Sequence, residues 1–452
     1  METRRRASPV VAASVTVVAL VTMALGYLNK ARCAGPPFDD AGRSEVFDRI
    51  KDSAVCYSDI QFLWLGRGID LHLFPYVGGA IAPDGSLTGG TVEYPVLSGM
   101  LMWLGGLASD TDADFLAWSA VLLAPFGALI AWMLGRLAGR VALIWSASPA
   151  LVMYAFHNWE LPVVATAVGA VAVMATRLPL RVRAVIAAVL LGIGFCLKLY
   201  PGAFVLPLAA YVLHGETERD RRDVRGALGV LAAAGITVAA INVPFAVAGY
   251  DGWRASFAFQ SLRQADITTN SIWYWGVRYL FETPGATPEV SAADEAAFQS
   301  AVDLLSPTLV LLSFAGALWV GRRSLATVGS YPWVQTSAVM LTGFLLFHKV
   351  HSPQYTLWIL PFFVLLRVPW QVVGAYLLTD VAVGVGVFRW FAALAAGQDA
   401  RSEETLVVLG VWGRTVLLVI LLVLFARAYV RTPPVRTTRP RMHRLESEEV
   451  PV

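Results

Sequence analysis

Long apolar runs, separated by short polar or arginine-rich connections, make up most of the chain. A helix that crosses a hydrocarbon layer about 30 Å thick needs about 20 apolar residues, and most of these runs approach that length. The pattern therefore predicts an all-α, polytopic integral membrane protein with about twelve transmembrane helices. The expected spans are residues 9–28, 113–135, 141–156, 160–176, 182–199, 201–214, 227–248, 305–321, 331–347, 354–366, 371–393 and 405–426.

One further apolar run, residues 96–107, has only about 12 residues and suits an interfacial or re-entrant helix better than a span. The distribution of arginine decides between the two, because cytoplasmic connections carry an excess of Lys and Arg. If this run stays out of the membrane, every arginine-rich connection faces the cytoplasm, whereas a crossing would turn the later ones outward. The cytoplasmic connections predicted in this way are Arg136–Arg140, Arg177–Arg183, Glu216–Arg225, Arg322–Arg323, Arg367 and the tail from Arg427.

This topology divides the chain into three parts. Residues 1–8 are expected to form a cytoplasmic N-terminus, residues 9–426 the transmembrane domain, and residues 427–452 a disordered, arginine-rich cytoplasmic tail. Two outer connections, residues 29–112 and 249–304, are long, and loops of such length are usually functional or disordered. Both hold aromatic residues among polar ones, which favours amphipathic helices that lie on the membrane surface.

Composition supports this interpretation. Of the 452 residues, 57% are hydrophobic and 15% are charged, and the mean hydropathy is +0.61. A soluble domain usually carries about a quarter charged residues. The net charge of +3 gives no indication of a nucleic-acid partner.

The unusual polar residues gather on the outer side. In the first outer loop, Asp59 lies among aromatic residues and near Arg67, the setting of a candidate general base that accepts a proton from a hydroxyl. A lone aspartate in a loop is more often a helix cap or a solvated charge. The same loop holds the rivals Asp39, Asp40, Asp48, Asp52 and Asp70.

Several spans end in polar residues on the same side. Lys198 and Lys349 lie at outer ends, where the positive-inside bias disfavours lysine, so a role in holding phosphate competes with simple snorkelling to the interface. The other outer polar residues are Glu93, Tyr94, His157, Asn158, Glu160, Arg263, His351, Gln354 and Tyr355.

Cys33 and Cys56 share the first outer loop, an oxidising location, where a disulfide is one expectation and two small buried thiols are the other. Asp380 and Arg414 fall near mid-depth in the last two spans, where charges are costly and normally paired. They are expected to form a structural ion pair, with a transport relay as the alternative. The chain shows no glycine-rich phosphate loop, and neither a cofactor nor a metal is expected.

Five outer segments follow one another along the chain: Tyr57-Ser58-Asp59, Glu93-Tyr94-Pro95, Asn158-Trp159-Glu160, Lys198-Leu199-Tyr200-Pro201 and Lys349 to Tyr355. This ordered set resembles glycosyltransferase family 87 of actinobacteria, whose members are polyprenyl-phosphate-sugar-dependent membrane enzymes of the GT-C fold and include a mannosyltransferase of phosphatidylinositol mannoside synthesis. The resemblance covers most of residues 10–425. It departs from the family at Val96, where proline is common, and at Glu160, where aspartate is expected.

The resemblance implies a mechanism. Asp59 would deprotonate an acceptor hydroxyl, which attacks the anomeric carbon with inversion and releases a lipid phosphate. Lys349, His351, Lys198 or Arg263 would hold that phosphate. The residues implied to bind the sugar or the acceptor are Glu93, Tyr94, Asn158, Glu160, Arg67, Gln354 and Tyr355.

The resemblance also implies partners and a location. The donor would be a lipid-linked sugar, and the acceptor would be a glycolipid or a cell-envelope glycan. Mannose is the sugar expected first, and arabinose is the alternative. The enzyme would lie in the plasma membrane among its lipids, with both termini in the cytoplasm and the active site facing outside.

Two other function classes stay open at this stage. A flippase or transporter of lipid-linked sugars would line several spans with polar groups at mid-depth, where the sequence offers mainly Asp380 and Arg414. A GT-C-like scaffold that has lost its activity is the third reading. The sequence does not indicate an oligomeric state.

Overall fold

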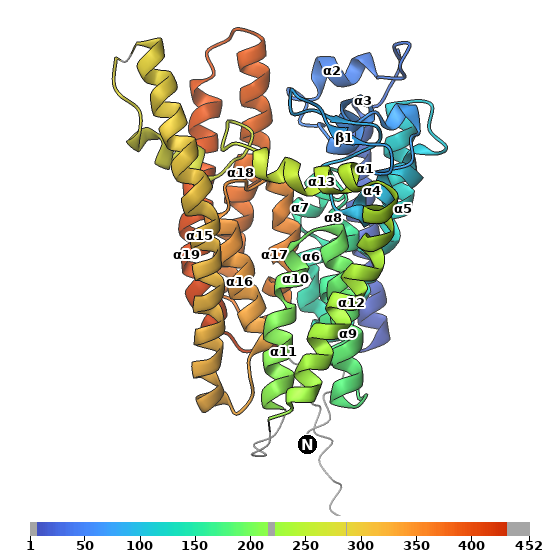
Figure 1. The fold of residues 1–452 in the computed structure, drawn as a ribbon, viewed down its shortest axis with the longest axis vertical. Coiled ribbons are helices and arrows are strands. Elements are labelled where there is room, and N and C mark those ends of the chain that lie inside the picture. The colour runs from blue at the N-terminus through green and yellow to red at the C-terminus, as the bar shows by residue number, and fades with distance from the viewer. Residues whose placement is uncertain (1–6, 216–221, 286, 432–452) are drawn as a thin grey trace, which may run out of the picture.

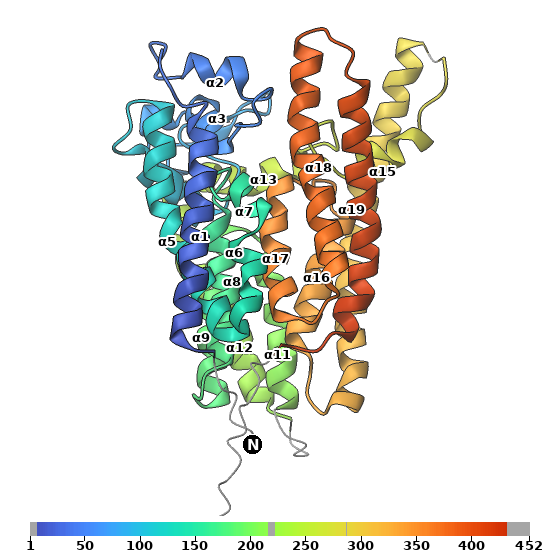
Figure 2. The same ribbon diagram turned by 180° about the vertical axis from the view of Figure 1, so that it is seen from behind.

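The computed structural model describes residues 7–215, 222–285 and 287–431, and this part of the chain is helical apart from one two-stranded sheet. Nearly all of the predicted cytoplasmic N-terminus and tail, and residues 216–221 of one predicted cytoplasmic connection, lie outside the described residues. Most helices run side by side along one axis, and the first outer loop lies at the end opposite the start of α1 (Figures 1 and 2). We call the end that carries this loop the outer end.

Seven helices of the described chain are long and apolar enough to cross a membrane. Because each has an apolar window of at least 18 residues, each can satisfy its backbone within a hydrocarbon layer. They are α1 (Pro9–Ala31), α5 (Asp112–Ala138), α9 (Leu180–Leu197), α12 (Val224–Ala248), α15 (Pro288–Val328), α18 (Trp370–Ala395) and α19 (Arg401–Arg427).

Four other predicted spans are shorter apolar helices, so the number of membrane crossings stays a prediction. These helices pack deep in the bundle; every residue of α17, for example, is buried. They are α8 (Glu160–Met174), α10 and α11 (Tyr200–Ala203 and Val205–His214), α16 (Trp333–Phe347), and η4 with α17 (Pro353–Tyr355 and Thr356–Leu365).

The predicted span 141–156 is not one continuous helix. It is divided into η2 (Gly139–Ala142), α6 (Leu143–Ser146) and α7 (Pro149–Tyr154). Proline has no backbone N–H and begins helices readily, and the Ser148 hydroxyl caps α7 by accepting from Ala150 N, so the chain restarts here. Trp145 and Tyr154 are buried, which shows that neighbouring helices enclose this irregular backbone.

The first outer loop is ordered and compact. It contains α2 (Glu45–Ile50), α3 (Asp59–Gly66), η1 (Ile69–Leu71), the antiparallel strands β1 (Ala80–Ile81) and β2 (Leu87–Thr88), and α4 (Val96–Gly106). Cys33 and Cys56 form a disulfide with their Cα atoms 6.0 Å apart. A buried ion pair of 3.2 Å joins Arg43 to Asp112 at the start of α5.

The run that the arginine distribution excluded from the spans forms α4, which has 11 residues and is therefore short for a crossing. The Ser98 hydroxyl of α4 donates to the carbonyl of Leu197 at 2.7 Å, which anchors the helix at the outer end of α9.

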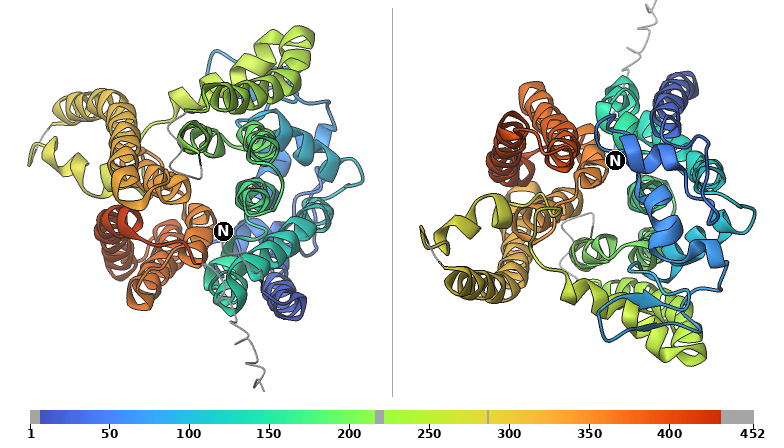
Figure 3. Two further views of the ribbon diagram at one scale, coloured as in Figure 1. Left: turned by 90° about the horizontal axis from the view of Figure 1, so that it is seen from below. Right: turned by 90° about the horizontal axis from the view of Figure 1, so that it is seen from above.

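The second outer loop begins with α13 (Tyr250–Leu262), which lies across the bundle near its outer end, and continues through α14 (Ile272–Trp275) and η3 (Val277–Leu280) (Figure 1). Seen from above, the first loop covers one part of the bundle and the chain around α14 and η3 covers the opposite part (Figure 3).

Candidate active site

Asp59 is the first residue of α3, and the helix holds it in place without using its carboxylate. The N-cap is Ser58, whose hydroxyl accepts from Gln61 N, so the cap that a lone aspartate often provides is already supplied. The backbone N–H of Asp59 donates to the carbonyl of His157 at 2.8 Å. This contact brings the first outer loop to the turn between α7 and α8.

Three side chains donate to the Asp59 carboxylate, one from its own loop and two from distant parts of the chain. The hydroxyl of Tyr57 is 3.0 Å from Oδ1, and the amide of Asn158 is 2.7 Å from Oδ2. Gln354, in η4 just before α17, reaches Oδ2 at 3.4 Å. The side chain of Asp59 is 21% exposed, so the carboxylate is oriented by its partners and is still accessible.

The rival aspartates have other surroundings. Asp39 accepts from the backbone N–H groups of Ala41 and Arg43, and Asp48 and Asp52 each lie 3.8 Å from the ammonium of Lys51. Asp40 is exposed and Asp70 is half-buried, and neither is joined to another segment among the described residues. Only Asp59 of this group connects with α8 and α17.

Glu160, the first residue of α8, is fully buried and already paired. One carboxylate oxygen accepts from the ammonium of Lys198, and the other accepts from the indole N–H of Trp358 at 2.5 Å. The Lys198 ammonium also lies 5.0 Å from the ring centre of Tyr94. Burial of a charge is costly unless the charge is paired. The ion pair of Glu160 and Lys198 provides that pairing for both charges.

Asn158 joins these two groups of residues. Its amide nitrogen donates both to Asp59 and, at 2.7 Å, to the hydroxyl of Tyr94. Burial, with a further contribution from the charge of Asp59, raises the pKa of Tyr94 well above its usual value, so the hydroxyl stays protonated. Asp59, Glu160 and Lys198 therefore belong to one connected network.

An aromatic stack forms one side of this network. The ring of Trp358 lies 3.8 Å from that of Tyr355 and 4.4 Å from that of Tyr200, and both pairs are stacked. Tyr200 follows Lys198 by two residues, so the segment Lys198–Pro201 supplies both a cation and a ring. The predicted residues Gln354 and Tyr355 thus lie beside Asn158 and Glu160.

Two predicted sugar-binding residues instead bind each other. Arg67 holds the Glu93 carboxylate through two nitrogens, at 2.5 and 3.1 Å. The amide of Gln260 in α13 donates to the Glu93 carbonyl at 2.5 Å. This ion pair therefore connects the first outer loop with α13 at the edge of the network.

The residues expected to hold a phosphate differ in their availability. Lys349 pairs with Asp303 at 2.8 Å, and Lys198 is engaged by Glu160. Arg263 is half-buried just beyond the end of α13, and within the described residues no side chain pairs with it. It is thus the predicted cation that is left free for an anion.

His351 is buried and neutral. Burial and then the charge of Arg414 lower the pKa of His351 well below its usual value. Its Nε2 atom is buried and has no hydrogen-bond partner among the described residues. A neutral ring can donate one N–H to a phosphate, but it brings no positive charge.

Asp380 and Arg414 lie 3.7 Å apart and are both buried, as expected for a structural ion pair. Arg414 also donates to the carbonyls of Asn270 at 2.8 Å and His351 at 3.2 Å. The pair therefore joins α18 and α19 to both outer segments that flank the network.

Sequence reasoning missed Lys30, in the last turn of α1. Its ammonium donates to the carbonyl of Tyr57 at 2.6 Å and lies 3.4 Å from Nδ1 of His157. The signal that singled out Lys198 and Lys349, a lysine at the outer end of a span, was equally present at Lys30. The predicted first span ended at Leu28, so Lys30 fell beyond it and was not considered.

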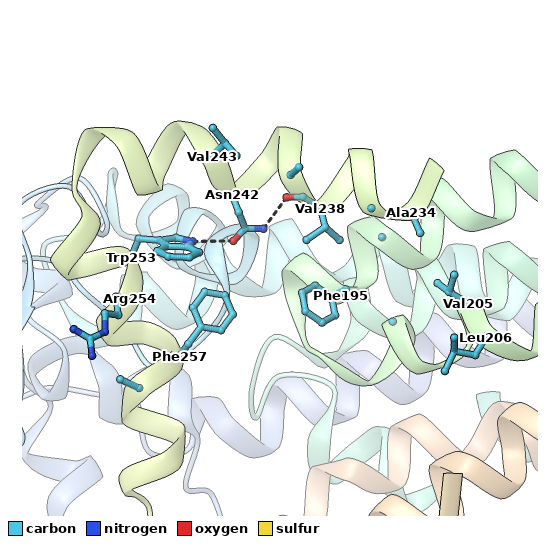
Figure 4. A pocket seen from close by; sticks show the side chains of 15 residues that line it. Phe195, Val205, Leu206, Ala234, Val238, Asn242, Val243, Trp253, Arg254 and Phe257 are labelled. Atoms are coloured by element: carbon cyan, nitrogen blue, oxygen red, sulfur yellow. Dashed lines mark hydrogen bonds between the residues drawn. The ribbon is translucent and has the colours of Figure 1, made fainter. Parts of the chain in front are cut away.

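An apolar groove of about 970 Å³ runs beside the network, between α9, α11, α12 and α13. Figure 4 shows Arg254, Trp253 and Phe257 at one end of it and Leu206 at the other. The indole of Trp253 donates to Asn242 at 3.0 Å, which fixes the only amide among the lining residues. Phe195 of this lining belongs to the last turn of α9, which Lys198 follows directly in the chain.

Comparison with known proteins decides the family. The model of glycosyltransferase family 87 matches residues 93–348, more than half of the chain. The chain belongs to glycosyltransferase family 87. No curated protein matches it.

Membership of family 87 makes the protein a membrane glycosyltransferase, and its apolar helices make it multi-pass. The matched region includes Glu93, Asn158, Glu160 and Lys198, whereas Asp59 lies before it. The matched region therefore contributes part of the network, and the contact of Asn158 joins that part to Asp59. Within the described residues no group of three or more His, Cys, Asp and Glu side chains could hold a metal ion.

Proposed function

We propose that this family 87 glycosyltransferase has the GT-C fold and moves a sugar from a polyprenyl-phosphate donor to a glycolipid or cell-envelope glycan. The sugar that we propose in the first place is mannose. The transfer takes place on the outer face of the plasma membrane of an actinobacterium and inverts the anomeric carbon. Asp59 is the general base. The observation that carries the proposal is the Asp59 carboxylate, which is accessible and is held by Tyr57 of its own loop and by Asn158 and Gln354 from two distant segments.

The proton path follows from these contacts. Oδ2 accepts from Asn158 and Gln354, whereas Oδ1 has Tyr57 alone among the described residues. Oδ1 therefore keeps a free lone pair. The acceptor hydroxyl gives its proton to Oδ1, its oxygen bonds to the anomeric carbon, and the bond from that carbon to the phosphate oxygen breaks.

The leaving group is a lipid phosphate, whose negative charge grows as that bond breaks. Arg263, which no described side chain pairs with and whose charge acts on Tyr355, is assigned to this phosphate. The apolar groove supports a lipid-linked donor, because a soluble sugar nucleotide would have no use for such a lining.

The outer location is supported by the topology. Both long loops lie at the end of the bundle opposite the start of α1 (Figures 1 and 2), and the first of them contains Asp59 and the disulfide. The arginine-rich connections support a cytoplasmic location for that start. A disulfide also suits an oxidising compartment.

The test is Asp59→Asn in a deletion strain, with glycolipids and cell-wall glycans profiled by mass spectrometry. Loss of a general base costs about 100- to 10,000-fold in rate, so the missing product should not return. Asp40→Asn, which changes an exposed aspartate of the same loop, is the matched control and should restore the product. Full restoration by Asp59→Asn at equal protein abundance would exclude Asp59 as the base.

Transport is tested with purified protein in vesicles that contain a labelled polyprenyl-phosphate mannose and an extracted acceptor lipid. A glycosyltransferase yields labelled glycolipid. Movement of the donor between leaflets without a new glycosidic bond would instead establish a flippase.

A further inference from the structure

Lys30 points into the protein, although it ends a transmembrane helix. An ammonium at such a position usually extends to water or to lipid headgroups. The residue is instead 3% exposed, and its ammonium lies between the Tyr57 carbonyl and the His157 ring. A buried lysine that contacts two neighbours of Asp59 calls for a role in the active site.

The contact with Lys30 sets the protonation of His157. While it is charged, the ammonium of Lys30 has donors and no acceptor, so the Nδ1 atom that faces it at 3.4 Å accepts with its lone pair. A neutral imidazole then carries its proton on Nε2. That atom faces Oδ2 of Asp59 at 3.8 Å.

The surroundings keep the ring neutral. His157 is 4% exposed, and burial lowers its pKa to about 4, with Asp59 opposing and Lys30 and Lys198 adding to the decrease. The other titratable groups that face the imidazole ring are the phenols of Tyr57 and Tyr154. Their ring centres lie 5.6 and 6.0 Å from the centre of the His157 ring.

We propose that Lys30 is a positioning residue that holds His157 as the Nε2–H tautomer, so that the ring directs an N–H at Oδ2 of Asp59. This inference rests on Asp59 as the base of the proposed function. The N–H supplements the donors from Asn158 and Gln354, and the distance shortens when substrates bind. Because Nε2 already carries a proton, His157 does not relay the proton that Asp59 accepts.

The consequence of losing Lys30 follows directly. In Lys30→Met the ring can adopt the other tautomer, which presents a lone pair to the Asp59 carboxylate. Loss of the neighbouring positive charge also raises the pKa of His157, so an imidazolium forms next to Asp59 as the pH falls. We expect kcat to fall at least about tenfold, with KM little changed, and the acid limb of the pH profile to move to higher pH.

Two substitutions of His157 separate tautomer control from simple bracing of the loop. The amide nitrogen of glutamine can occupy the position of Nε2, whereas asparagine reaches only the position of Nδ1. His157→Gln should therefore keep most of the activity, and His157→Asn should lose about as much as Lys30→Met.

The deciding experiment is a double-mutant cycle on the purified enzyme, with kcat measured from pH 5 to 9 for Lys30→Met, His157→Gln and their combination. Because glutamine has no tautomers, Lys30→Met should lower kcat little further in the His157→Gln background. Equal losses in both backgrounds would overturn the proposal and leave Lys30 as a brace for Tyr57. Lys30→Arg, which keeps a charged donor, should recover activity.

These outcomes are independent of the test of Asp59. If the Asp59→Asn enzyme is active, Asp59 is not the general base and the proposed function fails. If Asp59→Asn is inactive and the effects of Lys30→Met and His157→Gln are additive, only the proposed role of Lys30 is excluded. If Lys30→Met does not fold, the comparison of His157→Gln with His157→Asn still decides, because equal activity of the two would contradict a directed Nε2–H.

Discussion

At the scale of single residues, two buried ion pairs stand out, one inside the network and one outside it. Glu160 meets Lys198 and the indole of Trp358, and Arg43 meets Asp112 beneath the first outer loop. A buried ion pair adds little stability over apolar residues of the same volume, but removal of one partner leaves an uncompensated charge. These pairs therefore define where substrates meet charge: at Asp59 and Arg263, which remain accessible.

A prediction at this scale concerns Lys198. Lys198→Met leaves Glu160 buried without its cation and should destabilise the protein by about 3–5 kcal/mol. The combination Glu160→Gln with Lys198→Met removes both charges and should recover much of that loss. Thermal unfolding of the purified variants in nanodiscs measures both effects. A double variant no more stable than Lys198→Met would show that the pair does not neutralise itself.

At the scale of elements, the groove beside the network is formed by helices that meet through small residues. Gly192 of α9, Gly202 of α10 and Gly235 of α12 all line it. A Cβ atom at Gly235 would have no atom within 4 Å, so a larger side chain there enters the groove without a clash. A Cβ atom at Gly229, which is also on α12, would likewise have no atom within 4 Å. Gly229 does not line the groove.

This pair of glycines provides a matched test. Gly235→Leu should raise KM for a long-chain polyprenyl-phosphate mannose about tenfold, because an apolar side chain of this size replaces roughly 1–3 kcal/mol of lipid contact. Gly229→Leu should leave KM unchanged, and both should gain similar helix propensity. A donor with a truncated lipid should not distinguish the two variants. An unaltered KM for the long-chain donor in Gly235→Leu would exclude the groove as the binding site of its tail.

At the scale of the whole molecule, the network is assembled where two ordered outer loops meet the ends of the bundle. The ion pair of Asp380 and Arg414 secures the last two helices to the segments that contain Asn270 and His351. The contact between Gln260 and Glu93 joins the two loops to each other. The active site is thus enclosed by connections that alone would be too irregular to hold a geometry.

The sidedness of this arrangement is testable with single cysteines. The native thiols do not interfere, because Cys33 and Cys56 form a disulfide and Cys196 is buried. In intact cells, a membrane-impermeant maleimide should label Asp84→Cys in the first loop, and Arg322→Cys only after permeabilisation. The reverse pattern would invert the topology and place Asp59 in the cytoplasm.

Several features could be predicted from the sequence because they depend on local properties of the chain. Apolar runs indicated membrane helices, and the arginine distribution removed the short run that forms α4 from the spans. The ordered segments indicated family 87, which the family model confirms. What the sequence missed locally was the break of 141–156, since periodicity does not reveal a buried helix restart at Ser148 and Pro149.

The roles of the polar residues were decided only by the tertiary structure, because each depends on partners far along the chain. Asn158 and Gln354 donate to Asp59 across separations of 99 and 295 residues. The sequence ranked Lys198, Lys349 and Arg263 alike as cations at one face. In the folded protein Lys198 pairs with Glu160 and Lys349 pairs with Asp303, whereas no described side chain pairs with Arg263. Lys30 lies inside the protein, beside the ring of His157. Hydrophobicity by itself determined that the chain lies in a membrane, whereas the choice of which charge meets which was made by packing.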